Sequence, residues 1–122
     1  MESLPDDALV VRGGQNLTEN FVKGSGVRVE TEGTLQGVSV NSAHGATVEE
    51  LTAAVPQTGY PGILNTQIGV TTVGAVRELG GSVVASPTRT NPSHATLSGL
   101  TPEQASRLFR PTILNPNRRR QR

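Results

Sequence analysis

Glycine and proline divide this chain into segments that are too short for any long helix or strand. The 122 residues include 14 glycines and 8 prolines, and both residue types interrupt regular structure. The apolar segments between them, such as residues 8–12, 38–41 and 94–98, are only four or five residues long. Short β-type segments mixed with short helical ones predict an α+β fold with a small mixed or antiparallel sheet.

Local signals place each expected element. Short β-type segments predict strands at residues 8–12, 38–41, 82–86 and 94–98, and at 38–41 valines alternate with polar residues. Capping residues followed by glycine or proline predict helices at residues 18–23, 48–55, 73–79 and 102–109. The clearest signal is at Thr101, where Pro102 and Gln104 complete a capping box. Residues 57–67 are expected to form a loop.

Composition limits the core and the available chemistry. The only aromatic residues are Phe21, Tyr60 and Phe109, so aliphatic side chains must form most of the core. This length allows one domain, which we expect to span residues 1–114. The absence of cysteine excludes disulfides and thiolate metal sites. The two histidines have no metal-ligand spacing, so we expect no bound metal.

The charge is unevenly distributed. Residues 1–106 contain five basic and ten acidic side chains, whereas residues 107–122 contain six arginines and no acid. An acidic body argues against a broad phosphate-binding face. Residues 115–122 are predicted to form a disordered basic tail. Such a tail is either a solvated end or a contact for an acidic partner or nucleic acid.

Targeting signals are not evident in this sequence. It has no run of about 18 apolar residues, so no membrane span is expected. The first seven residues carry three acids and no base, the reverse of the charged end of a signal peptide. We therefore expect a cytoplasmic protein, and an effector delivered by a dedicated secretion machine is the alternative.

Three of the predicted strands carry polar residues that are suited to ligand binding. Arg12, beside Gly13, would place a fork of donors at a strand end, which suits a phosphate or carboxylate. Ser39 and Ser42 offer hydroxyls that could orient a ribose. His94 is the natural proton carrier, because imidazole titrates near neutral pH. The alternative for each residue is an ordinary structural or solvated side chain.

Three segments together resemble the small bacterial toxins and effectors of the ADP-ribosyltransferase-like clan. They are the strand ending in Arg12-Gly13, the Gly-Val-Ser-Val strand at residues 37–40, and the Asn-Pro-Ser-His-Ala segment at residues 91–95. The resemblance implies an ADP-ribosyltransferase-like fold that uses NAD. It implies that Arg12 holds the phosphate and that Ser39 supports the nicotinamide ribose.

The third strand departs from the pattern of that clan. Active transferases usually present a glutamate there, but residues 94–98 contain no acid. Some divergent toxins related to this fold also lack that glutamate. In this interpretation, His94 is the polar or proton-transferring partner in the site.

These observations support three hypotheses for function. The first is a toxin-type protein that binds NAD or a related nucleotide, with ADP-ribosyl transfer or NAD cleavage as its activity and an antitoxin or immunity protein as its partner. The second is a small ribonuclease toxin that uses His94, with His44, for acid–base catalysis. The third is a non-catalytic protein-interaction module that acts through its loops and its basic tail.

Overall fold

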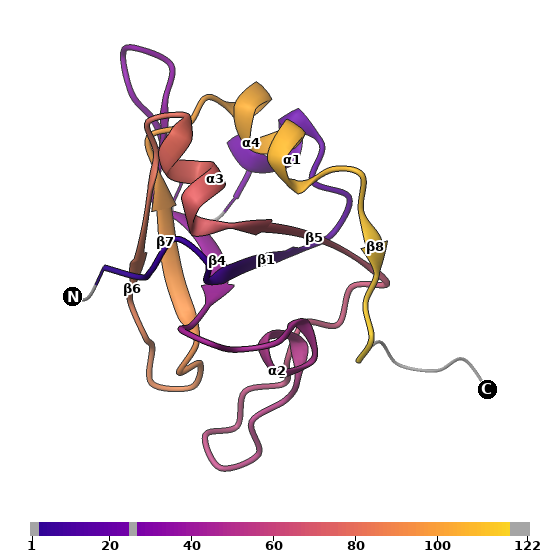
Figure 1. Cartoon of the computed structure of the whole chain (residues 1–122). Coiled ribbons are helices and arrows are strands. Elements are labelled where there is room, and N and C mark those ends of the chain that lie inside the picture. Colours follow the sequence, from indigo (N-terminus) through magenta and orange to yellow (C-terminus); the bar gives the residue numbers. More distant parts are fainter. Residues whose placement is uncertain (1–2, 25–26, 118–122) are drawn as a thin grey trace.

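A six-stranded antiparallel sheet runs through the molecule (Figure 1). The computed structural model describes residues 3–24 and 27–117. The strand order is β6-β7-β4-β1-β5-β8, and each neighbouring pair is antiparallel. Its strands are β1 (Leu9–Gly13), β4 (Val38–Ser42), β5 (Gln67–Thr72), β6 (Ser82–Ala85), β7 (His94–Ser98) and β8 (Ile113–Leu114). A separate hairpin pairs β2 (Arg28–Val29) with β3 (Leu35–Gln36).

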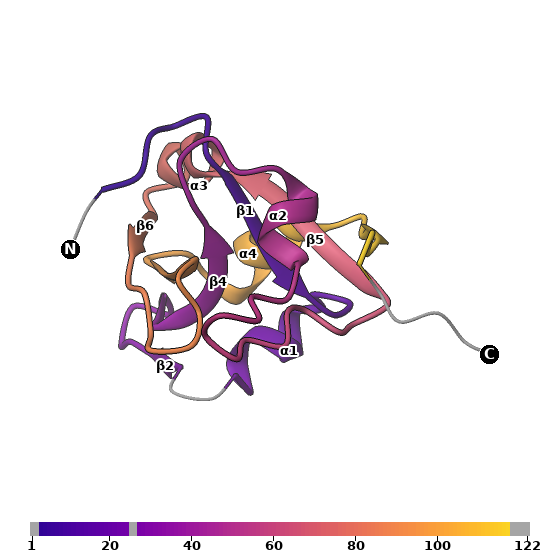
Figure 2. The ribbon, with the colours of Figure 1, turned by 90° about the horizontal axis from the view of Figure 1, so that it is seen from below.

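In the described part of the chain, four short helices cover the sheet unequally. They are α1 (Thr18–Val22), α2 (Val48–Thr52), α3 (Val73–Glu78) and α4 (Pro102–Phe109). Helices α1, α3 and α4 lie on one face, and α2 lies on the other with the long loop that follows it (Figures 1 and 2). This arrangement confirms the predicted α+β class with a small antiparallel sheet and short helices.

The main core lies between the sheet and the three helices. Phe21 of α1 and Phe109 of α4 are fully buried there, with ring centroids 5.9 Å apart. Aliphatic residues from the sheet and from α3 surround these rings. The capping box predicted at Thr101 starts α4 as expected, because its hydroxyl accepts from Gln104 N at 3.1 Å. Thr47 caps α2 in the same way.

Strand β5 was missed, because residues 57–67 were predicted as a loop and no strand was placed at residues 68–72. Gly69 interrupts the β-branched pattern there, and glycine is depleted in strands. In the structure, α4 packs directly over this position. A Cβ on Gly69 would lie 2.6 Å from the Phe109 Cβ and 2.8 Å from Asn16 Nδ2. The glycine therefore marks a close approach of helix and strand rather than a loop.

Helix α2 ends earlier than predicted. The prediction extended it to residue 55, but Ala53 is already extended, with φ −76° and ψ 151°. The Thr52 carbonyl accepts from Ile63 N at 3.1 Å, so the returning loop takes the place of a further helical turn. Val55 instead forms a bridge with Tyr60. Residues 53–66, which we call the cleft loop, are thereby folded back along α2.

The prediction that a disordered tail begins at residue 115 is wrong at that boundary. Asn115 is fully buried, and its amide donates to the carbonyls of Ile63 and Asn65 at 2.7 and 2.9 Å. Asn117 donates to the Glu49 carbonyl at 2.7 Å. The polar composition of this segment hid these bonds, because both asparagines use their amides to satisfy backbone carbonyls. The four arginines of the tail lie outside the described residues.

The described part of the chain includes no helix that is long and apolar enough to cross a membrane.

Candidate functional site

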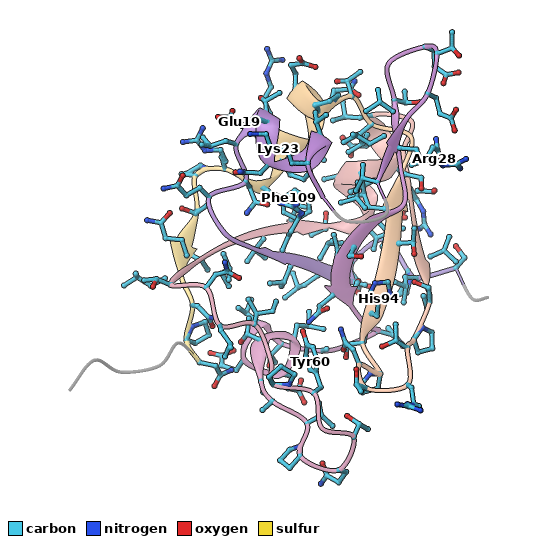
Figure 3. The ribbon with its side chains drawn as sticks, turned by 180° about the vertical axis from the view of Figure 1, so that it is seen from behind. Glu19, Lys23, Arg28, Tyr60, His94 and Phe109 are labelled. Carbon is cyan, nitrogen blue, oxygen red and sulfur yellow. The ribbon has the colours of Figure 1, made fainter. Side chains whose placement is uncertain are left out.

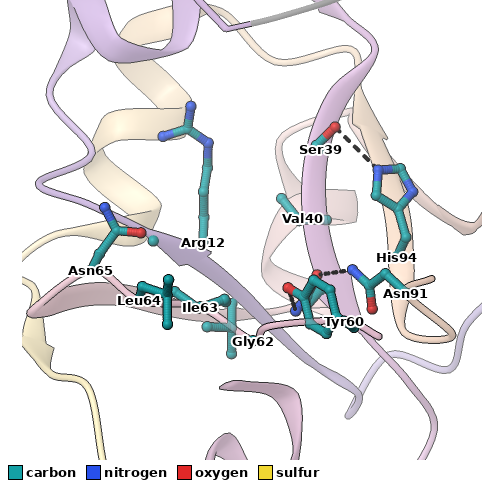
Figure 4. Close-up of a pocket in the computed structure, with 13 residues that line it drawn as sticks. Arg12, Ser39, Val40, Tyr60, Gly62, Ile63, Leu64, Asn65, Asn91 and His94 are labelled. Atoms are coloured by element: carbon teal, nitrogen blue, oxygen red, sulfur yellow. Dashed lines mark hydrogen bonds between the residues drawn. The ribbon is translucent and has the colours of Figure 1, made fainter. Parts of the chain in front are cut away.

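The sheet opens between its two central strands, and the candidate site lies in this opening. Strand β1 pairs with β5 over five residues, and β4 pairs with β7 over four. In contrast, β1 and β4 pair with each other only at Val10–Ser42 and Val11–Asn41. Beyond those two pairs the strands diverge and leave a cavity of about 490 Å³ (Figure 4). That volume lies in the range of small-molecule sites.

Three residues predicted from the sequence meet at this opening, which we call the cleft. Arg12 comes from β1, Ser39 from β4 and His94 from β7. Figure 4 shows Arg12 on one side of the cleft, with Ser39 and His94 together on the other. The other lining residues belong to the same strands, the cleft loop and the turn before β7: Val11, Gly13, Val40, Asn41, Tyr60, Gly62, Ile63, Leu64, Asn65 and Asn91.

Arg12 provides a partly buried cation with unused donors. Its guanidinium lies 4.3 Å from the centroid of the Phe21 ring and donates to Asn16 Oδ1 at 2.9 Å and to the Asn20 carbonyl at 3.3 Å. Among the described residues, no carboxylate forms an ion pair with it. Burial lowers the pKa of Arg12, because desolvation disfavours the charged form. The group nevertheless stays protonated at neutral pH.

Asn16 holds Arg12 in place and was not predicted. It is fully buried in a left-handed conformation with φ 58°, which asparagine tolerates better than most residues. Its amide donates to the carbonyls of Arg12 and Gly14 at 3.1 and 3.0 Å. The backbone carbonyl of Asn16 in turn accepts a hydrogen bond from the Ser106 hydroxyl at 2.8 Å. The sequence signal for this role of Asn16 would have been the turn Gly13-Gly14-Gln15-Asn16.

Ser39 and His94 are directly hydrogen-bonded. The His94 Nε2 lies 3.1 Å from the Ser39 Oγ, and its Nδ1 lies 2.9 Å from the Ser86 carbonyl oxygen. The Ser86 hydroxyl is 3.0 Å from Nδ1 and 2.7 Å from the Thr96 hydroxyl. The imidazole is thus held from both ring nitrogens, with its Nε2 side directed to an exposed serine on the neighbouring strand.

A buried amide network forms the base of the cleft. Asn41 donates to the Leu51 carbonyl at 2.8 Å and to the Tyr60 hydroxyl at 3.0 Å. Asn91 donates to Asn41 Oδ1 at 2.9 Å. The network therefore fastens the cleft loop, through Tyr60, to β4 and to the turn before β7 (Figure 4). Figure 3 shows Tyr60 on the cleft loop and His94 on β7. These roles were not predicted from the sequence, since the partners are far apart in the chain.

The structure places the other two predicted site residues, Ser42 and Gly13, differently. Ser42 is three residues from Ser39, and side chains of a strand alternate between faces, so the two serines point to opposite faces. The Ser42 hydroxyl donates to the Leu9 carbonyl at 2.6 Å instead. Gly13 does line the cleft. However, Asn65 and Ile63 of the cleft loop occupy the space beside its Cα.

His44 is also separate from the cleft. It lines another cavity together with Arg77 and residues 3–5. The pairing of His94 with His44 in the ribonuclease hypothesis is therefore not supported. Among the described residues, no group of three or more acidic or histidine side chains could hold a metal ion.

The cleft combines one cation, one serine–histidine pair and neutral amides. None of the described residues that line it is an aspartate or glutamate. The arrangement can hold an anionic group on Arg12 and move a proton at the Ser39–His94 pair. Comparisons of this chain with protein-family models, with curated proteins and with solved structures found no match.

Proposed function

We propose that this protein binds NAD or a related nucleotide in the cleft and cleaves it or transfers its ADP-ribosyl group. The observation that carries the proposal is the meeting of Arg12, Ser39 and His94 where β1 and β4 diverge. In the resemblance to ADP-ribosyltransferase-like toxins, these positions hold the phosphate and the ribose. The cavity volume of about 490 Å³ is also suitable for part of such a ligand.

Arg12 is the proposed phosphate ligand. Two of its N–H groups bond to Asn16 and Asn20, whereas a guanidinium has five in total. The remaining donors are available to an anion, and a bidentate contact with phosphate is a common use of arginine. A phosphate in the cleft would also offset the cost of burying this charge. Binding is thus favoured by a cation that lacks a protein counter-ion among the described residues.

Unregulated consumption of NAD would harm the cell that makes the protein. The proposed function therefore includes a toxin role and an antitoxin or immunity protein that neutralises it. Such a partner would protect the producing cell most simply by covering the cleft.

Calorimetric titration with NAD, combined with a nicotinamide-release assay, tests the proposal. Arg12→Gln keeps much of the side-chain stem and removes the charge. We expect it to weaken NAD binding about 10- to 100-fold, since hydrogen bonds to charged groups contribute about 1.5–3 kcal/mol. Arg89→Gln, at an exposed position outside the cleft, is the matched control and should bind as the wild type does. Unchanged binding in Arg12→Gln, or no binding by the wild type, would contradict the proposal.

A further inference from the structure

The surroundings of His94 fix which of its nitrogens carries the proton in the neutral ring. A carbonyl oxygen can only accept a hydrogen bond, and the Ser86 carbonyl lies 2.9 Å from Nδ1. Nδ1 must therefore be the donor, because a bare nitrogen would face the oxygen lone pairs. The Ser86 hydroxyl also lies near Nδ1 and has Thr96 as its second partner, at 2.7 Å. The neutral imidazole consequently has its free lone pair on Nε2.

The free lone pair of Nε2 makes Ser39 the donor in the bond between them. The Ser39 Oγ is 3.1 Å from Nε2, so its proton points to the imidazole. The serine is exposed on β4 and lines the cleft. A hydroxyl bonded to a histidine that a third group orients is the arrangement of an activated nucleophile. Here the orienting group is a backbone carbonyl, and no carboxylate is required to fix the ring.

We propose that Ser39 is a covalent nucleophile and that His94 is its general base. This inference deepens the proposed function and rests on it for the identity of the substrate. With NAD held by Arg12, the Ser39 Oγ forms a bond to C1′ of the nicotinamide ribose while its proton passes to His94 Nε2. The C1′–N bond breaks with its electron pair going to the ring nitrogen, so nicotinamide leaves neutral and the imidazolium carries the positive charge.

A second displacement completes the cycle. A water molecule attacks C1′, the C1′–Oγ bond breaks, and the Ser39 oxygen regains the proton held by His94. The water proton that remains goes to solvent, so the net products are ADP-ribose, nicotinamide and one proton. A serine nucleophile suits this cleft because none of its described lining residues is an acid that could stabilise a free ribosyl cation. An acceptor hydroxyl in place of water would give transfer instead of hydrolysis.

Two reagents test the nucleophile, and one of them is independent of NAD. A fluorophosphonate probe should phosphonylate Ser39 with loss of fluoride. Excess protein, mixed with NAD and quenched in acid at short times, should carry one ADP-ribosyl group on the same residue. Peptide mapping by mass spectrometry locates both adducts. His94→Gln should slow the modification about 100-fold or more, within the usual contribution of general base catalysis, and Ser39→Ala should abolish it.

Matched variants control for general effects on the protein. His44→Gln and Ser82→Ala change exposed residues outside the cleft, and both should react at the wild-type rate. Thermal unfolding of each variant separates loss of reactivity from loss of the fold.

The outcomes separate the two proposals. Modification of Ser39 by either reagent, dependent on His94, supports the nucleophile, even if NAD fails to bind and the proposed function falls. If neither reagent modifies Ser39, the inference is overturned. In that case, NAD binding and nicotinamide release by the wild type would still leave the proposed function standing.

Discussion

The two faces of the sheet are covered differently. One face carries most of the apolar core, and the other carries most of the candidate site. On the face covered by α1, α3 and α4, fifteen of the described residues form one buried apolar cluster around Phe21 and Phe109. On the opposite face, under α2 and the cleft loop, the corresponding cluster has only three buried members, Val11, Leu51 and Ile68. Most residues that line the cleft lie on this second, thinly packed side, whereas the Arg12 guanidinium reaches across to Phe21 of the helix-covered core.

Hydrogen bonds replace apolar packing on the second face. The cleft loop is fastened by the amides of Asn41 and Asn115, which bind backbone carbonyls or the Tyr60 hydroxyl. Polar anchors of this kind position a loop without filling the space beside it, so room is left for a ligand. The helix-covered face thus stabilises the domain, and the α2 face can therefore leave exposed polar groups at the cleft.

The largest effect should come from the helix-covered face. Phe109→Ala removes a fully buried ring and should lower the free energy of unfolding by about 3–5 kcal/mol. Chemical denaturation measures this change. A loss below about 1 kcal/mol would show that this face does not carry the stability assigned to it.

An intermediate effect is expected in the cleft loop, where two glycines form a matched pair. Gly59 and Gly62 have φ of 84° and 81°, so alanine at either position costs about 1–2 kcal/mol of backbone strain. A Cβ on Gly62 would also lie 2.7 Å from the Thr52 carbonyl oxygen, whereas one on Gly59 meets nothing within 4 Å.

Denaturation and NAD titration of both variants test the difference. Gly62→Ala should lose a further 1–3 kcal/mol or so from overpacking, and it should weaken NAD binding because the contact with Thr52 displaces a loop residue that lines the cleft. Gly59→Ala should bind NAD as the wild type does. Equal losses of stability in both variants would mean that the loop is not held against α2.

The smallest effect on stability is expected within the cleft itself. Ser39→Ala should change the free energy of unfolding by no more than about 0.5 kcal/mol, as at other exposed positions. The same variant should lose its activity on NAD. A clear loss of stability would place Ser39 among the structural residues. It would contradict the assignment of stability to the helix-covered face alone.

Local signals in the sequence predicted those elements that local interactions determine. The capping box predicted at Thr101 forms, and the strand at residues 94–98 has its predicted bounds. Strand β5 was missed because Gly69 is explained only by the approach of Phe109, 40 residues along the chain. The ordered position of Asn115 likewise depends on hydrogen bonds that its amide donates to backbone carbonyls of the cleft loop.

The candidate site was predictable in part. Arg12, Ser39 and His94 were singled out because each is a polar residue in an apolar strand, and the structure brings them to one cleft. Ser42 is not among the residues that line the cleft, and the two-residue period of a strand would have favoured Asn41 over it. Tyr60 and Asn91 could not be assigned, since their contacts depend on how the cleft loop folds back.

The most direct test of the central claim is an amide ¹H–¹⁵N titration of the protein with NAD. If the divergence of β1 and β4 forms the ligand site, the largest shift changes will map to Arg12, Ser39, Tyr60, Asn91 and His94 and to their immediate neighbours. Shift changes concentrated instead at the cavity that His44 and Arg77 line, or no changes at the cleft at saturating NAD, would contradict it.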